Sequence, residues 1–188
     1  MMDDNGNVYE QIVRRDMLFT GKYLKLERLY VKLPDGRTGE REIVRVPDAV
    51  SVLPLDEEGN VHLVRQHRPA IERTLVEIPA GLLDGDEKPE EAALRECEEE
   101  TGYRPKKLQE LLTYAHAEGY STGFVTLFLG TDLEYRAGLE PDSTEFIEPV
   151  CMPFHKLFEM VKTNQIVDSK TILSALLVQG MINDDTRE

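Results

Sequence analysis

Residues 81–103 read GLLDGDEKPEEAALRECEEETGY, and glutamates crowd the second half of this run. Pro89 and Gly102 predict the two ends of a helix, because proline suits the first helical position and glycine the left-handed residue that stops a helix. The acidic residues directly after the proline suit the positive end of the helix dipole. The run, which we call the box segment, therefore predicts a helix from about Pro89 to Thr101 with a glycine-containing loop before it.

Three glutamates of this predicted helix share one face. Glu96 precedes Glu99 by three positions and Glu100 by four, which is the spacing of neighbours on a helix surface. Like charges so spaced destabilise a helix by roughly a few tenths of a kcal/mol per pair, and a bound cation removes that repulsion. Oxygen ligands of this kind suit Mg²⁺ or Mn²⁺, which keep waters and take up phosphate groups. The alternative is an acidic face that only meets solvent.

The wider spacing decides between these two interpretations. The box segment matches the pattern G-x5-E-x7-R-E-U-x-E-E-x-G-U, in which U is apolar, although Tyr103 is a less typical last residue because of its hydroxyl. The box segment thus resembles the signature of the Nudix hydrolase family. The matching fixed residues are Gly81, Glu87, Arg95, Glu96, Glu99, Glu100 and Gly102. A chance match at so many fixed positions is rare, which favours a functional site.

The resemblance implies an α/β protein with the Nudix α/β/α sandwich, a mixed sheet and a small N-terminal antiparallel β-sheet. The metal ligands it implies are the backbone carbonyl of Ala80 and the carboxylates of Glu96, Glu99 and Glu100. Glu87 and Arg95 are expected to pin the loop before the helix. The implied reaction is attack of a metal-activated water on phosphorus, with Mg²⁺, or Mn²⁺ in its place, as the cofactor.

Stretches outside the box segment indicate a branch of the family. Residues 64–68 (VRQHR) and 75–81 (LVEIPAG) look like the corresponding stretches of ADP-ribose pyrophosphatases and related nucleoside-diphosphate-sugar hydrolases, as do residues 33–37 and 166–171. The resemblance covers about residues 20–180. The substrate contacts that it implies come from Arg68, Glu77, Arg41 and Gln66.

The expected reaction is therefore Mg²⁺-dependent hydrolysis of the diphosphate bond in ADP-ribose or a nucleoside diphosphate sugar, giving a nucleoside monophosphate and a sugar phosphate. One alternative is a Nudix pyrophosphatase for nucleoside triphosphates or dinucleotide polyphosphates. Another is a non-catalytic module that binds a nucleotide. Such modules usually lose glutamates or the arginine of the box segment, and here all are present.

One loop departs from the pattern of ADP-ribose pyrophosphatases. Residues 120–124 read YSTGF, with Thr122 where these enzymes usually carry proline, which leaves nucleoside diphosphate sugars open as substrates. The general base stays open as well. The candidates are Glu145, Asp142 and Glu140 in an acidic loop near a late strand, and Glu145 is the first choice. A base on such a loop can close over bound substrate.

Charge and composition exclude other classes of protein. The formal net charge is −14 and the chain offers no basic face, which argues against a sequence-independent grip on nucleic acid. Hydrophobic residues make up 40%, enough for a core, yet no apolar run approaches the roughly 18 residues of a membrane span. The first residues lack a secretory pattern, so Cys97 and Cys151 are expected as reduced thiols in a cytoplasmic protein.

The remaining pattern predicts strands first and helices near the end. Residues 20–47 suggest a hairpin around the Pro34–Gly36 turn, and residues 49–55 and 61–64 suggest a second hairpin. Further strands are expected at 74–78, 108–114, 124–129 and 146–152, and helices at 156–162 and 170–182.

This order contains no regular alternation of strand and helix, which favours a mixed sheet with helices packed on it. We expect two domains. Residues 1–47 form a β-strand region, which in the resembled branch is exchanged between the two subunits of a homodimer. Residues 48–188 form the hydrolase domain.

Overall fold

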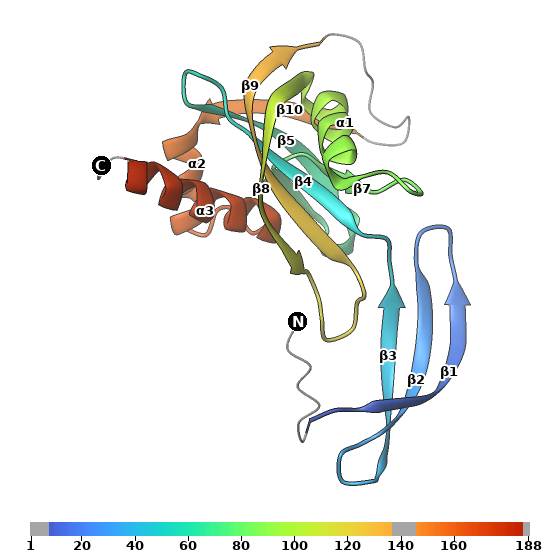
Figure 1. Cartoon of the computed structure of the whole chain (residues 1–188). Helices are drawn as coiled ribbons and strands as arrows, with labels where there is room; N and C mark the ends of the chain where they lie inside the picture. Colours follow the sequence, from blue (N-terminus) through green and yellow to red (C-terminus); the bar gives the residue numbers. More distant parts are fainter. Residues whose placement is uncertain (1–7, 137–145, 186–188) are drawn as a thin grey trace. The chain divides into compact units, whose positions relative to one another are not determined.

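The computed structural model describes residues 8–136 and 146–185, with two compact units (Figure 1). The first unit comprises the described residues up to Asp48 together with Ala115–Phe124. The second comprises the described residues from Ala49 to Tyr114 and from Val125 onward. No helix in these described ranges is both long enough and apolar enough to cross a membrane.

The first unit is built on an antiparallel sheet with the strand order β1-β2-β3. Its strands are β1 (Gln11–Thr20), β2 (Lys25–Lys32) and β3 (Thr38–Arg45). The predicted hairpin is β2–β3, and its turn depends on Gly36, whose φ of 86° is in the region that favours glycine. Strand β1 was not predicted, because its sequence QIVRRDMLFT lacks a strict alternation of apolar and polar residues.

The second unit contains two sheets, with the orders β7-β4-β9-β8 and β10-β5-β6. The first sheet is mixed, because β4 runs parallel to β9 and antiparallel to β7. Its strands are β4 (Ala49–Pro54), β7 (Ala80–Leu82), β8 (Tyr103–Ala115) and β9 (Phe124–Tyr135). The strands of the second sheet are β5 (Asn60–Arg68), β6 (Arg73–Glu77) and β10 (Ile147–Pro153), with the short helix η1 (Pro69–Ile71) between β5 and β6.

The second predicted hairpin was wrong, because β4 and β5 belong to different sheets. Near their connecting turn they share only one isolated bridge, between Leu55 and Val61. Both edges of β4 are already hydrogen-bonded, one to β7 and the other to β9. Strand β5 therefore pairs with β6 and β10 instead.

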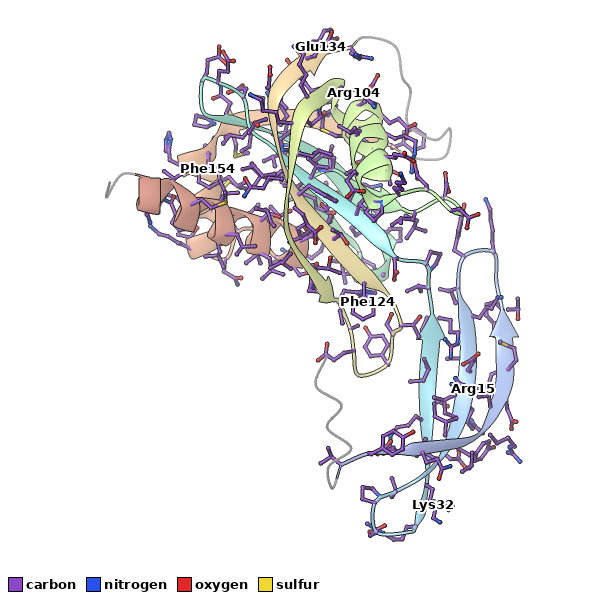
Figure 2. All side chains as sticks on the ribbon, viewed as in Figure 1. Arg15, Lys32, Arg104, Phe124, Glu134 and Phe154 are labelled. Atoms are coloured by element: carbon purple, nitrogen blue, oxygen red, sulfur yellow. The ribbon has the colours of Figure 1, made fainter. Side chains whose placement is uncertain are left out.

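Helices pack on both sides of these sheets and complete the expected sandwich. They are α1 (Pro89–Thr101), α2 (Phe154–Lys162) and α3 (Ser169–Asp185), and Figure 1 shows α1 and the α2–α3 pair on opposite sides of the strands. On one side, Val50 and Val52 of β4 pack with α1. On the other, Leu53 of β4 packs in a cluster with α2 and α3, where Phe154 (Figure 2) is buried. Strand β4 is thus buried on both faces.

Candidate active site

Helix α1 presents the box glutamates because its apolar residues fix its rotation. Ala92, Ala93 and Cys97 are completely buried in the cluster with Val50 and Val52. Burial raises the pKa of the Cys97 thiol to about 12, so this cysteine is a packing residue and not a nucleophile. The helix ends as predicted at Gly102, which has a φ of 77° and whose N–H donates to the carbonyl of Glu98.

Arg95 joins the loop before α1 to the helix. Its Nε and Nη2 donate to the two carboxylate oxygens of Glu87 at 3.0 and 2.9 Å. Its Nη1 donates to Glu96 at 2.6 Å and to Glu99 at 3.2 Å. The bond to Arg95 lowers the pKa of Glu87, and the hydrogen bond to Glu87 is the main cause of the raised pKa of Arg95. The structure therefore brings three carboxylates together around one guanidinium.

Glu96 lies against the backbone of Gly81 at the start of the box segment. A Cβ at Gly81 would fall 1.9 Å from Oε1 of Glu96, far closer than non-bonded atoms approach, so the carboxylate would have to shift. The close approach of this carboxylate, and not a turn, therefore favours glycine here. This contact places Glu96 beside strand β7.

The place of Glu100 on the acidic face of the predicted helix suggests an exposed side chain, and this expectation is wrong. The residue is 6% exposed, and its Oε2 accepts a hydrogen bond of 3.0 Å from the backbone N–H of Ala80. Helix α1 packs closely on β7, which hides this carboxylate from bulk solvent. Glu99 is only partly buried, with 29% of its side chain exposed. The three glutamates thus share a helix face but differ in accessibility.

A second charged cluster lies next to the box segment. Arg68 donates from Nε and Nη2 to the two carboxylate oxygens of Glu77 at 2.9 and 2.7 Å. The ammonium of Lys170 also donates to Glu77, whose side chain is 1% exposed. The hydrogen bond to Glu77 raises the pKa of Arg68, and the charges of Asp168 and Glu100 add to this effect. Glu100 therefore connects the two clusters electrostatically.

Lys170 and Asp168 belong to this cluster although neither was predicted as a site residue. Lys170 donates to Asp168 at 2.8 Å, and Asp168 accepts from the N–H of Thr171 at the start of α3. The hydroxyl of Thr171 in turn receives the N–H of Ile78 at 2.9 Å. These bonds tie α3 to the strand that carries Glu77. The sequence carries a signal for them, since residues 166–171 resemble the corresponding stretch of one branch of hydrolases.

Comparisons with known proteins find relatives of this chain. The NUDIX domain matches residues 45–174. The ADP-ribose pyrophosphatase of Bacillus subtilis (strain 168) is 37% identical over 171 residues, which cover 90% of this chain and 92% of that protein. The chain belongs to the Nudix family. A second relative, the methanol dehydrogenase activator of Bacillus methanolicus, is 36% identical and covers 93% and 95% of the two chains.

The Nudix fold is also found in a solved structure similar to this chain. A crystal structure of an ADP compounds hydrolase superposes with a TM-score of 0.84, at 21% identity, over 95% of this chain and 97% of that one. The predicted family and fold class are confirmed, and the predicted enzyme class, a Nudix pyrophosphatase, agrees with these matches.

The donor set of the Nudix box suits the hard divalent cation that the family implies. Glu96, Glu99 and Glu100 offer only carboxylate oxygens, which Mg²⁺ and Mn²⁺ prefer. The guanidinium of Arg95 already supplies a positive charge between Glu96 and Glu99. This one positive charge does not balance three carboxylates, so the chemistry of the donors fits a divalent cation.

Other predicted site residues lie elsewhere or are not described. Gln66 is half-buried in β5 and pairs with Leu75 of β6 in the ladder. Arg41 is exposed on β3 of the first unit and pairs with Glu10. The candidate bases lie outside the described residues: Glu140, Asp142 and Glu145.

The loop that carries Thr122 in place of the expected proline belongs to the first unit. Thr122 accepts the N–H of Val46 through its hydroxyl at 3.3 Å and donates its own N–H to the carbonyl of Val44. Proline has no N–H, so it would remove this second bond. The threonine therefore fastens the loop to the end of β3.

Proposed function

We propose that this Nudix hydrolase cleaves the diphosphate bond of ADP-ribose or a nucleoside diphosphate sugar in a Mg²⁺-dependent reaction, releasing a nucleoside monophosphate and a sugar phosphate. The observation that carries the proposal is the guanidinium of Arg95, which joins Glu87 of the loop to Glu96 and Glu99 of the helix. The 37% identity to an ADP-ribose pyrophosphatase over 90% of the chain supports the substrate class.

In this proposal the side chains have separate tasks. Glu96, Glu99 and Glu100, with the carbonyl of Ala80, hold the divalent cation. When bound, Mg²⁺ lowers the pKa of a water and neutralises the diphosphate. Arg95 and Glu87 hold the loop and helix in register, so that the carboxylates keep one geometry.

The substrate is proposed to bind over the second charged cluster. Arg68 has 39% of its side chain exposed, although Glu77 occupies one side of its guanidinium. Its remaining N–H groups are available to a phosphate oxygen, and arginine is well suited to such planar contacts. Glu77 orients Arg68. Gln66, which lies on β5 like Arg68, adds a polar contact to the sugar. Arg41 is proposed to contact the nucleotide from the partner subunit.

A substrate panel tests this function. The full chain is incubated with Mg²⁺ or Mn²⁺ and with ADP-ribose, several nucleoside diphosphate sugars, nucleoside triphosphates and dinucleotide polyphosphates, and the products are separated by chromatography. The proposal predicts a nucleoside monophosphate plus a sugar phosphate from the first two classes. Faster release of phosphate or diphosphate from triphosphates contradicts it, and background turnover with every compound favours a binding module.

The strand region at residues 1–47 is proposed to make a homodimer by exchange between two copies. Strand β1 is exposed along nearly its whole length, including its apolar residues Val13, Met17 and Phe19. Exposed apolar patches of this kind mark surfaces that associate with other chains. A second copy is the proposed occupant, and in such a dimer Arg41 of each chain would contact its partner's substrate.

A further inference from the structure

Three potential metal ligands outside the Nudix box converge in the second unit. Asp56, His62 and Cys151 each place one ligand atom within 4.8 Å of the other two. They come from separate places in the chain: the turn after β4, strand β5 and strand β10. None of them was assigned a role by the sequence analysis or is used by the proposed reaction.

The backbone fixes the position of all three residues. His62 and Cys151 are direct partners in the antiparallel ladder of β5 and β10, so their side chains lie side by side on the same face. Asp56 begins a tight turn in which its N–H donates to the carbonyl of Asn60 at 2.9 Å. The N–H of Phe154, directly after β10, donates to Gly59 in the same turn at 2.9 Å. The three donors therefore approach one another without a loop having to close.

The distance between two of the donors fits a shared ion. Nε2 of His62 lies 3.2 Å from Oδ2 of Asp56. Nitrogen and oxygen ligands bound at about 2.0 Å to a tetrahedral ion lie about 3.3 Å apart, so these two need little movement. The sulfur of the exposed Cys151 lies within 4.8 Å of both. The side chains of His62 and Asp56 are only 11% and 17% exposed. The ring of Tyr103 packs on the imidazole at a centroid distance of 4.1 Å and limits its rotation.

A polar pocket of about 300 Å³ opens beside these ligands. Asp56 and His62 form part of its wall, and the acidic residues Glu57, Glu58 and Asp132 form another part. This negative lining favours the entry of a dication. Because three protein ligands leave one position of a tetrahedral ion open, the pocket has room for a water there.

We propose that Asp56, His62 and Cys151 bind a divalent transition metal ion of the Zn²⁺ class. The donors are one nitrogen, one sulfur and one oxygen, a set that suits Zn²⁺ and not the Mg²⁺ that the all-oxygen Nudix box prefers. On binding, the Cys151 thiol loses its proton to solvent and the thiolate forms a bond to the metal, so the two negative ligands neutralise the ion. The bound ion cross-links the turn at Asp56 to β5 and β10.

Cobalt spectroscopy tests the proposal on the full chain. The protein is freed of metal with a chelator and titrated with Co²⁺, which reports thiolate ligands through a charge-transfer band. We expect the band to reach full intensity at one equivalent of Co²⁺ and to disappear on addition of Zn²⁺. It should be absent in Cys151→Ser and His62→Gln. The matched control is Cys97→Ala, which removes the other cysteine and keeps the band.

A second control, Glu99→Gln, tests whether the box glutamates contribute to the band. This variant should also keep the band. Alkylation of the unchanged chain gives a measurement that needs no variant: one equivalent of Zn²⁺ should block modification of Cys151, identified by mass mapping. A wild-type chain without the band, a band lost in Cys97→Ala, or a Cys151 thiol that reacts equally fast with and without Zn²⁺ overturns the proposal.

Discussion

Gly81 and Glu96 lie in contact, with the carboxylate of Glu96 filling the space that a side chain at Gly81 would occupy. An added Cβ would stand 1.9 Å from Oε1 and 2.5 Å from Oε2 of Glu96. Since Glu96 is held on its other side by Arg95 at 2.6 Å, the carboxylate has little freedom to retreat. The glycine at the start of the box segment therefore sets the position of a proposed metal ligand.

Gly81→Ala should displace Glu96 and weaken metal binding. Changes to residues that orient metal ligands typically lower metal affinity or activity by about 10- to 100-fold, and we expect a loss in this range. The measurement is the Mg²⁺ concentration that gives half-maximal hydrolysis, together with kcat. The control is Gly180→Ala in α3, where an added Cβ meets no atom within 4 Å. Equal Mg²⁺ dependence of the two variants would contradict the role of Gly81.

Glu99→Gln and Glu100→Gln should each reduce kcat by orders of magnitude, because each removes a charged ligand of the proposed cation. The loss of folding stability should be larger for Glu100→Gln than for Glu99→Gln. Glu99 is 29% exposed at its side chain, whereas Glu100 is buried and accepts the N–H of Ala80. Turnover and circular dichroism of both variants check this, with Glu90→Gln on the exposed start of α1 as the control. Full activity in both variants removes these residues from the site.

Stability should depend on the ionisation of Glu77. Burial opposes its ionisation, but Arg68 and Lys170 outweigh burial and hold the pKa of Glu77 below its ordinary value of 4.5. A lowered pKa in the folded state means that this stabilisation is complete above pH 4.5 and is lost as the pH falls through the lower folded value.

Glu77→Gln is therefore expected to cost about 3 kcal/mol at pH 7 and much less in acid, where the wild-type carboxylate is protonated. Urea unfolding at both pH values measures this. The estimate is at the low end for a broken buried pair, because Arg68 is 39% exposed and can be hydrated. The control Glu148→Gln breaks an exposed pair with Arg65 and should cost less than about 1 kcal/mol. A loss that does not change with pH argues against this ion cluster.

The proposed general base is tested by Glu145→Gln, which should lower kcat far more than it raises KM, because the change removes proton transfer and not substrate contacts. The comparison variant is Glu134→Gln, an exposed acid on β9 that pairs with Arg136. Near-normal turnover of the Glu145 variant excludes this residue, and Asp142→Asn and Glu140→Gln are then the next variants to measure.

Phe19→Asp should weaken the proposed dimer. Phe19 is 55% exposed on β1, and burying such a side chain contributes about 2 kcal/mol, or roughly a 30-fold change in the dimer dissociation constant. Light scattering over a range of concentrations measures the constant. Leu176→Asp on α3 controls for a charge placed at an exposed apolar residue of the second unit. A wild-type chain that stays monomeric at all concentrations rules out the dimer.

Local signals in the sequence were sufficient to predict the structure of the box segment. Pro89 and Gly102 mark the two ends of α1 as expected, because helix ends depend on the conformations of single residues. The contact of Arg95 with Glu87 was anticipated through the family resemblance, and the structure brings the two residues together. These features lie close together in the sequence.

Features that depend on distant parts of the chain were missed. The pairing of β4 with β9 joins residues more than seventy positions apart, as between Ala49 and Val125, and no local pattern indicates it. The burial of Glu100 follows from the packing of α1 on β7, which helix periodicity alone does not predict. Lys170 reaches Glu77 only because α3 is bonded back to Ile78.

Strand β4 contributes alternate side chains to two separate apolar clusters, with Val50 and Val52 on the side of α1 and Leu53 on the side of α2 and α3. Because both clusters pack on β4, neither can lose its packing without exposing apolar residues of the other. Amide protons of α1 and α3 should therefore exchange with deuterated solvent at matching rates, as one cooperative folding unit. A destabilising substitution in α3 would then also destabilise α1, although the two helices share no direct bond among the described hydrogen bonds.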